Sequence, residues 1–520
     1  MTRTPAISAP AAPAAPAPTA PRPRDWAALA VLTLAVALLA VDSTVLSLAI
    51  PSLSADLAPS AGQLLWIGDI YSFVLAGLLV TMGNVADRIG RRRLLLIGTA
   101  GFGISSVLAA LAPSAGALIA ARALLGLSGA TIMPSTLSLV RNIFPGARHR
   151  ATAIAIWSAG SSGGTALGPL VGGLLLERFW WGSVFLINVP VMLLVLVAGP
   201  RLLPESRNEH GGPVDPLSAA LSVGAIVPLV YAVKTFAHDG PTPACALALL
   251  AGLAAGWFFV RRQRTLTTPL IDIGLFGRPA FTWAVAATVL AVFALSGLLY
   301  FFSQYLQLVR GYSTLRAGLT ELPASLAAIV VVALVGAAVR RLGNGGALGG
   351  GLALAAVGLV IVAAAQSHGG IVVICAGLLV IGAGIGLAFT VSTGAVLGAV
   401  PADRAGAASA ISETGLELGA ALGIAVLGTV QDVGYRLHLR AVAGVPDAVA
   451  GAARQSLATL AGAIDRADAA QADFYLQAQR AFTHAMQTTA VVAAVILLLA
   501  AVMAWRHVPA GDASDQAGER

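Results

Sequence analysis

Charged side chains are scarce in this chain, and their scarcity excludes most soluble folds. Only 10% of the 520 residues are Asp, Glu, Lys or Arg, whereas 58% are hydrophobic. A soluble domain carries about 25% charged residues. Soluble chains also divide into domains beyond roughly 250–300 residues, because a single core stops growing at that size. Lipid must therefore cover much of the apolar surface of this chain.

Cysteine and catalytic motifs are also nearly absent. Cys245 and Cys375 lie in separate apolar segments with no metal or redox spacing, and we interpret them as small buried hydrophobes. The seven histidines are scattered, and neither an HExxH pair nor a GxxxxGK[ST] phosphate loop occurs. The sequence therefore predicts no enzyme, no catalytic residue, no metal and no cofactor. Energy for any transport would come from an ion or solute gradient.

Long apolar runs dominate the chain instead. About fourteen runs of roughly 18–25 residues are long enough to cross a bilayer as helices, and hydrocarbon admits only helices and closed barrels. The expected fold class is therefore an all-α polytopic membrane protein. The expected spans are 26–50, 63–83, 92–112, 116–140, 151–174, 182–203, 214–234, 244–262, 280–302, 317–340, 346–365, 370–398, 404–431 and 481–505.

The distribution of arginine predicts the orientation. The net charge is +8, and Lys234 is the single lysine among 31 basic residues. These residues occupy short loops between apolar runs, so we expect a lipid bilayer and no nucleic acid as partner. With the N-terminus inside, the inner loops hold about 16 Arg and the outer loops about 4 Arg or Lys. Both termini are therefore expected in the cytoplasm, with the chain spanning the cytoplasmic membrane several times.

Composition also suggests an arrangement of domains. Residues 1–25 are rich in Ala and Pro, form no core and are expected to be a disordered cytoplasmic tail. The first apolar run follows and is interpreted as a retained helix. The remaining parts are a six-helix bundle (26–203), a linker with two extra helices (204–264), a second six-helix bundle (265–506) and a cytoplasmic tail (507–520). An extracellular loop (432–480) in the second bundle has a pattern that suits helices outside the bilayer.

Ionisable residues inside the spans are the candidate functional groups, because a charge in the bilayer is costly and tends to face a partner or a cavity. Asp42, Asp69 and Arg122 lie in the first, second and fourth spans. Arg122 can be a structural ion-pair partner of an acid or can tune a proton site. Glu321 lies near the outer end of the tenth span, where it can be an interface residue.

Glu413 and Glu417 lie deep in the thirteenth span and are four residues apart. That spacing places them on one helix face, where like charges repel. At least one of them is expected to hold a proton near neutral pH. This arrangement suits a proton-coupled cation carrier, since cation and proton compete for one anionic site. A structural pair that is hydrogen-bonded to neighbouring helices is the alternative.

Aromatic and glycine residues supply the remaining candidates. Rings can hold a lipophilic cation by cation–π contact, and the candidates are Trp66, Tyr71, Trp157 and Phe389. Interface anchors or core residues are the alternative. The fifth span is dense in small residues, which allow helix backbones to approach closely, and Pro169 within it favours a kink. Its residues are Gly160, Gly164, Gly168, Pro169, Gly172 and Gly173.

Three segments resemble motifs of the major facilitator superfamily. The loop 83–93 resembles its signature loop at Gly83, Asp87, Arg88, Gly90, Arg91 and Arg92. In that loop Asp87 would cap a helix or pair with Arg and latch the two halves shut on the inside. Residues 122–130 resemble the fourth-helix motif, with Leu125 in place of the usual Gln. Residues 160–173 resemble the fifth-helix antiporter motif.

Further segments resemble the fourteen-helix drug:proton antiporters, in particular multidrug exporters of quaternary ammonium compounds. These segments are 42–46, 65–72 and 185–190. The resemblance implies two six-helix bundles plus two extra helices, and it implies proton coupling or cation recognition for Asp42, Asp69, Glu413 and Glu417. Those exporters carry another acid in the tenth helix, where this chain has Ala327 and Ala328. The resemblance therefore leaves open whether this chain transports divalent cations.

The expected function is proton-coupled efflux of lipophilic cations. Proton coupling is assigned to Asp42, Arg122, Glu413 and Glu417, whereas Asp69, the two glutamates and the four aromatic candidates bind substrate between the bundles. The expected partners are the cation, protons and lipid, and the expected oligomeric state is a monomer. A dedicated exporter of one endogenous metabolite or antibiotic in the same fold is the first alternative, and a solute-binding membrane receptor is the second.

Overall fold

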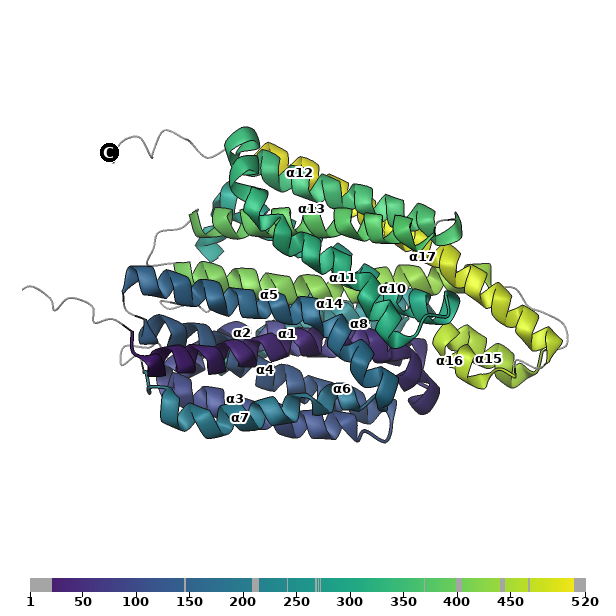
Figure 1. Cartoon of the computed structure of the whole chain (residues 1–520), viewed down its shortest axis with the longest axis horizontal. Coiled ribbons are helices and arrows are strands. Elements are labelled where there is room, and N and C mark those ends of the chain that lie inside the picture. The colour runs from purple at the N-terminus through teal and green to yellow at the C-terminus, as the bar shows by residue number, and fades with distance from the viewer. Residues whose placement is uncertain are drawn as a thin grey trace, which may run out of the picture.

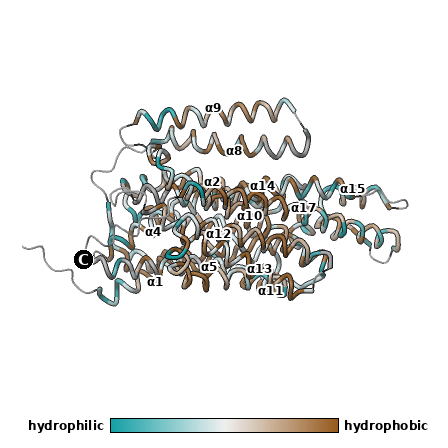
Figure 2. Tube along the Cα trace, turned by 90° about the horizontal axis from the view of Figure 1, so that it is seen from above, coloured by the Kyte–Doolittle hydropathy of each residue, from teal (hydrophilic) through white to brown (hydrophobic). Residues whose placement is uncertain are grey.

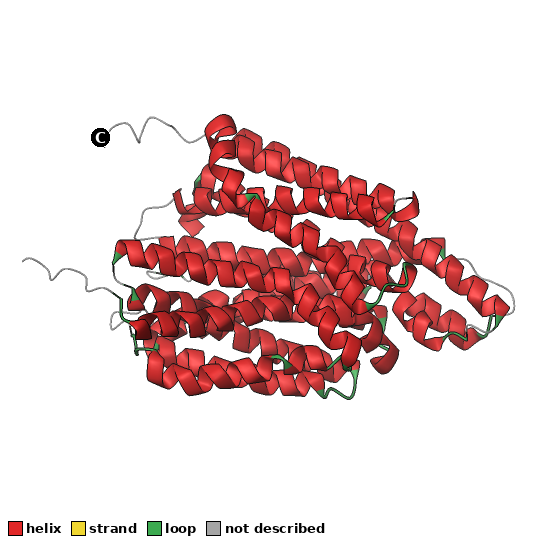
Figure 3. Cartoon of the chain, viewed as in Figure 1, coloured by secondary structure: helices red, strands yellow, loops and turns green. Residues whose placement is uncertain are grey.

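The computed structural model describes residues 21–144, 146–207, 215–240, 242–266, 269, 271, 273–368, 370–398, 405–439, 445–465 and 468–508. All regular structure in these ranges is helical (Figure 3). The predicted all-α membrane fold is therefore confirmed. Most of the predicted tails, 1–25 and 507–520, lies outside the described residues.

The first half of the chain forms one group of packed helices, here called the N-bundle (Figure 1). Within it α1 packs against α5 and α7, and α4 packs against α2 and α3. Its members are α1 (Pro23–Leu57), α2 (Ala61–Ile89), α3 (Arg91–Ala110), α4 (Ala115–Ile143), α5 (Ala147–Arg178), α6 (Ser183–Leu186) and α7 (Asn188–Leu202).

The second half forms the C-bundle, in which α12 packs against α13 and α17, and α10 packs against α14. Two short helices, α15 (Asp447–Gln455) and α16 (Leu457–Ala463), project at one end of the molecule (Figure 1). The members of the C-bundle are α10 (Pro279–Gln304), the π-helix η2 (Tyr305–Val309), α11 (Thr314–Val330), α12 (Val332–His368), α13 (Ile371–Gly398), α14 (Ala405–His438) and α17 (Ala469–His507).

Between the two bundles in sequence lies a hairpin of α8 (Pro216–Asp239) and α9 (Pro243–Thr265), followed by the short η1 (Ile273–Gly277). Figure 2 shows this hairpin along one side of the molecule. α8 contacts both α2 and α14, whereas α9 packs against α8 and leaves most of its apolar surface exposed. In a bilayer that surface of α9 faces lipid.

Two ends of the molecule are named from their composition. The Arg-rich end holds the α2–α3 turn, the start of α5 and the end of α9. The far end is the opposite one, where α15 and α16 project (Figure 1). α1 therefore runs from the Arg-rich end to the far end, and α2 runs back.

The predicted spans all fall on helices, and eleven helical stretches of the described residues are long and apolar enough to cross a membrane. This is consistent with the predicted fourteen helices. Three boundaries differ. The sixth span is divided into α6 and α7. The tenth is interrupted where α11 meets α12, and α12 comprises two helices that join at Gly343, whose φ is +70°, between the predicted tenth and eleventh spans. The predicted loop 432–480 is shorter, because α14 extends to His438 and α17 starts at Ala469.

Local sequence explains where several helices begin. Ser60 caps α2 and forms a reciprocal capping box with Gln63. Ser114 and Ser313 cap α4 and α11 by accepting a backbone N–H three residues further along. These caps satisfy N–H groups that have no partner within the helix, so each helix starts at a defined residue and its functional side chains have a defined height in the bundle.

Candidate functional site

Asp42 of α1 is fully buried and hydrogen-bonded within the N-bundle. Asn188 at the start of α7 donates from Nδ2 to Asp42 Oδ1 at 2.7 Å and to Ser106 Oγ at 3.1 Å. Arg122 Nη1 of α4 lies 3.5 Å from Asp42 Oδ2, and both side chains are at most 1% exposed. Additional hydrogen bonds help to offset the cost of removing a buried ion pair from water. Helices α1, α3, α4 and α7 therefore meet in one polar network.

Arg122 also ties α4 to α2. Its Nε donates to the carbonyl of Ile67 at 3.0 Å, and its Nη2 donates to the carbonyl of Gly68 at 3.3 Å. Its guanidinium lies 5.1 Å from the centre of the Tyr71 ring, at a cation–π distance. The structure places Arg122 in an ion pair with Asp42, an arrangement that fits both interpretations, because a paired arginine also tunes the acid it contacts.

Asp69 is fully buried on α2, two residues before Tyr71, and lies within electrostatic range of Arg122 and Tyr300. Arg122 is thus the cation nearest to two acids from two helices. Asp42 makes the ion pair with Arg122 at 3.5 Å, and Asp69 adds a second acid that interacts with the same guanidinium.

The two glutamates of α14 face the N-bundle across this point. Ser72 of α2 hydrogen-bonds Glu417, and Glu417 lies within electrostatic range of Tyr71. Glu413 interacts with Glu417 as a like charge. Both glutamates are partly exposed, and within the described part of the chain neither has a basic partner. This pair therefore places negative charge without a basic partner next to α2 of the N-bundle.

Tyr300 of α10 closes the space above these acids toward the far end. Its hydroxyl donates to the carbonyl of Leu64 on α2 at 2.7 Å. Gly68 makes this approach possible, because a Cβ at that position would lie 2.8 Å from Tyr300 Cε2. Asp42, Asp69, Glu413, Glu417 and Arg122 are called the central carboxylate cluster from here on.

The predicted aromatic residues are distributed around this cluster unequally. Tyr71 is 2% exposed and belongs to it through Arg122. Trp157 of α5 is buried and donates from Nε1 to Thr136 Oγ1 of α4 at 3.3 Å. Trp66 packs on Phe73, with ring centres 6.3 Å apart, beside α8 and α14. Phe389 of α13 is 40% exposed. Tyr71 thus contacts a member of the cluster directly.

The fifth helix packs through its small residues. Gly160, Gly164, Gly168 and Gly172 form one stripe of α5 that contacts α1, because an added Cβ at each would collide with α1. Two further residues of the motif reach the C-bundle. A Cβ on Gly173 would lie 2.7 Å from the Cα of Leu315 on α11, and Gly318 of α11 packs on the carbonyl of Pro169. The motif therefore joins the two bundles as well as α1 and α5.

The predicted latch loop contacts the segment that follows α7. Gly90, with φ +112°, approaches Glu205 so closely that a Cβ would lie 2.6 Å from its Oε1. The backbone N–H of Arg92 donates to Glu205 Oε1 at 3.2 Å, and that of Arg91 donates to the carbonyl of Ser206 at 3.0 Å. Gly83 packs near Pro134 and Arg88 is exposed, whereas the side chain of Asp87 lies outside the described residues.

The two bundles of membrane-spanning helices, with a buried Asp–Arg pair and acids where the bundles meet, are typical of a membrane carrier protein. The sequence comparison identifies its family. Residues 32–424 match the family model of the Major Facilitator Superfamily.

The chain belongs to the Major Facilitator Superfamily.

It is therefore a multi-pass membrane transporter of small molecules. Over 481 residues it is 48% identical to the multidrug efflux pump LfrA of Mycolicibacterium smegmatis, covering 92% of this chain and 95% of LfrA. It is 36% identical over 485 residues to the methyl viologen resistance protein SmvA of Salmonella typhimurium, covering 93% and 98%. The fold resembles that of a bacterial homologue of the human lysosomal transporter Spinster, with TM-score 0.65, 18% identity, and coverage of 94% and 99%.

Sequence reasoning missed the uncharged polar residues that hydrogen-bond the acids of the central carboxylate cluster. Asn188 and Ser72 lie in segments that carried the family resemblance, yet neither was assigned a role. Ser106 had no signal at all, since a single serine in an apolar helix is common. A buried amide such as Asn188 could have been found, because an amide in a span needs a partner.

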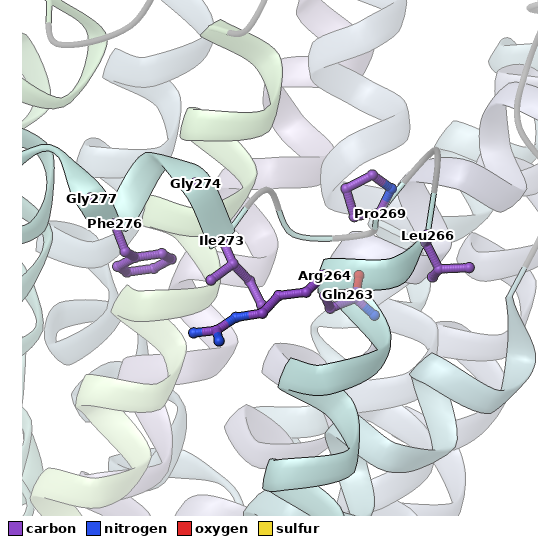
Figure 4. Close-up of a pocket in the computed structure, with 8 residues that line it drawn as sticks. All are labelled: Gln263, Arg264, Leu266, Pro269, Ile273, Gly274, Phe276 and Gly277. Atoms are coloured by element: carbon purple, nitrogen blue, oxygen red, sulfur yellow. The ribbon is translucent and has the colours of Figure 1, made fainter.

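A separate groove of about 630 Å³ lies at the Arg-rich end between α9 and η1 (Figure 4). Figure 4 shows Arg264 reaching from the end of α9 toward η1. Arg264 is the charged residue of this lining, so the groove repels cations and is unsuited to the chemistry of the carboxylate cluster. Its lining residues are Gln263, Arg264, Leu266, Pro269, Ile273, Gly274, Phe276 and Gly277.

Proposed function

We propose that this transporter exports lipophilic cations, including quaternary ammonium compounds, in exchange for protons. The observation that supports the proposal most directly is the pair Glu413 and Glu417, which has no basic partner among the described residues and whose Glu417 interacts with Tyr71 and Ser72 of the N-bundle. A region with excess negative charge and an aromatic wall attracts organic cations and disfavours anions. The 48% identity to a protein named as a multidrug efflux pump agrees with this chemistry.

The same acids supply the coupling. A cation and a proton neutralise the same carboxylates, so binding of one lowers the affinity for the other. In our mechanism a cation enters from the cytoplasm and binds the ionised Glu413 and Glu417 beside Asp69. Protons that arrive from outside neutralise these acids and release the cation. Asp42 with Arg122 then acts as the proton-linked element of the N-bundle.

The contacts between the bundles support an inward-facing state. Tyr300 bonds Leu64, Gln307 Nε2 donates to the carbonyl of Leu48 at 3.1 Å, and Thr314 Oγ1 donates to the carbonyl of Gly173 at 3.3 Å. All these bonds lie in the far half of the helices. We assign the far end to the outside and the Arg-rich end to the cytoplasm, because cytoplasmic loops carry excess arginine. Alternating access is then rocking of one bundle against the other.

Proton flux in proteoliposomes tests this function. Vesicles that contain the protein and a pH-sensitive dye receive tetraphenylphosphonium, a monovalent cation, or methyl viologen, a divalent one. Saturable proton movement upon cation addition is expected, and it should be lost in the double variant Glu413→Gln/Glu417→Gln. Comparison of the two cations tests whether Ala327 and Ala328 restrict the accepted charge. Folded wild-type protein that moves no protons with any cation would contradict the proposal and favour a dedicated exporter or a receptor.

A further inference from the structure

Glu321 of α11 is a buried acid outside the central carboxylate cluster. Its side chain is 4% exposed, and Oε1 has no hydrogen-bond partner. A carboxyl group is rarely buried without a partner, because the ionised form loses its hydration without compensation. Such a group in a native structure needs a physical explanation.

The position of Glu321 on its helix places it at the seam between the bundles. Gly318, one turn before it, packs on the carbonyl of Pro169 in α5 of the N-bundle. Ala324, one turn after it, is packed by Gly382 in α13 of the C-bundle. At about 100° per residue, Glu321 points about 60° from each of these two directions. The seam between α5, α11 and α13 therefore covers the carboxyl group.

No charged residue in the described part of the chain compensates Glu321 in this seam. Burial removes water from the Glu321 carboxyl group, and no charged side chain of the described residues interacts with it. Arg316 on the same helix lies over the Tyr312 ring at 4.0 Å, and α13 has no Asp, Glu, Lys or Arg. Charged residues on the elements that contact α11 include Glu177 and Arg178 on α5, Asp42 and Asp56 on α1, Arg310 after η2, and Arg340 and Arg341 on α12.

We propose that Glu321 is a second proton-binding site, and that the seam of α5 with α11 closes only when this carboxyl group holds a proton. In the closed seam the neutral acid avoids an unpaired buried charge. When the bundles separate at the far end, water reaches Glu321 and it can ionise. Closure then requires a proton from the water on that side. This inference rests on the proposed function only for the opening of the far end during transport.

The proposal makes the open and closed populations depend on pH with a defined sign. The closed seam binds one more proton than the open seam, so acid favours closure and alkali favours opening. For one linked proton the open-to-closed ratio changes by up to about tenfold per pH unit. A proton bound here is taken from the far side and returned to it. Glu321 therefore controls closure and adds no transported proton.

Spin-label distances across the seam test this directly. Labels replace Phe179, 58% exposed at the end of α5, and Leu319, 47% exposed on α11, after Cys245 and Cys375 are changed to serine. In substrate-free nanodiscs, the long-distance population should rise between about pH 5 and about pH 9. Glu321→Gln should hold the short distance throughout. Asp56→Asn removes an exposed acid that bonds Trp181 at 2.6 Å, and it should keep the wild-type response.

A neutral variant that retains the full pH response of the distance would overturn the proposal. Should Glu321→Gln fail to fold, Glu321→Met provides a second neutral side chain of similar length that needs no hydrogen bond. Tetraphenylphosphonium binding to the same variant separates the two proposals, because the central cluster is intact and binding should persist. Failure of the efflux function would instead leave a pH-dependent seam in a protein that moves no protons with cations.

Discussion

Asp42 and the pair Glu413 and Glu417 are acids on membrane-spanning helices of opposite bundles, yet their surroundings differ. Asp42 is fully buried, and both of its oxygens are engaged, one by Asn188 and the other by Arg122. The glutamates are partly exposed, repel each other and have one described hydrogen bond, from Ser72 to Glu417. The charge of Asp42 is compensated by Arg122 within the N-bundle. The charges of Glu413 and Glu417 are left for a cation or protons that enter between the bundles.

This difference separates two roles that are indistinguishable in the sequence. A carboxylate with a buried arginine partner gains little from an added cation, because its charge is already neutralised. A pair of carboxylates without such a partner can exchange a cation for protons at small structural cost. We therefore expect Asp42 with Arg122 to govern stability and conformation, and Glu413 with Glu417 to govern substrate and proton binding.

The largest effect should follow from breaking the compensated side. Arg122→Gln leaves Asp42 as a buried, unpaired charge and removes the bonds to Ile67 and Gly68. The expected loss is about 3–5 kcal/mol, measured as thermal unfolding in detergent. The double variant Arg122→Gln/Asp42→Asn should recover part of it, since no charge is then stranded. Equal stability of the single variant and wild type would mean that the pair contributes nothing.

A smaller but more specific effect should follow on the uncompensated side. Glu413→Gln and Glu417→Gln each remove one negative charge and one proton site, while the N-bundle network stays intact. Proton-driven cation efflux should fall about 10–100-fold, as expected for a lost charge-assisted contact, with little change in melting temperature. Asp42→Asn, in contrast, should reduce both efflux and stability. Full efflux by both single glutamate variants would abolish the distinction between the two sides.

An intermediate effect is expected where the two sides meet. Tyr300→Phe removes the donor to the carbonyl of Leu64 and weakens the far-end contact by about 1 kcal/mol. The far end should then open more often, which a thiol reagent applied from that side to a cysteine at Gln304 would detect as faster labelling. Tyr312→Phe serves as the matched control, because Tyr312 lies outside this contact.

The smallest effect concerns the α8–α9 hairpin, which contains neither the Asp42–Arg122 pair nor the two glutamates. Arg262 bonds Asp215 from Nε at 2.9 Å and Nη2 at 3.0 Å, and these bonds, with those from Ser218, lower the pKa of Asp215 to about 2. Because the folded-state pKa is depressed, the stabilisation is present above about pH 4 and is lost as the pH falls toward about 2. Asp215→Asn should destabilise the start of α8 by about 1 kcal/mol, which is measured as faster hydrogen exchange there near neutral pH. The variant should also lose the acid sensitivity of this region.

Much of the fold could be predicted because hydropathy acts locally. Apolar runs such as 92–112 and 244–262 match α3 and α9 closely, since each helix must satisfy its backbone within itself. Interruptions were harder to predict. The break between α6 and α7 and the break between α11 and α12 lie inside predicted spans, because they depend on how neighbouring helices pack, whereas the turn at Gly343 falls between two predicted spans. Beyond the apolar runs, α14 and α17 extend as helices that pack against each other.

The sequence by itself determined that this chain crosses a membrane, that its acids lie on the first, second and thirteenth spans, and that it belongs with facilitator transporters. Composition, spacing and motif carry that information because each is local. Only the tertiary structure decided which acid is compensated. Arg122 lies 80 residues along the chain from Asp42 and 53 from Asp69, and nothing in that spacing selects one partner. Packing of α4 between α1 and α2 made the choice, because a buried charge takes the partner that the close-packed helices place within reach.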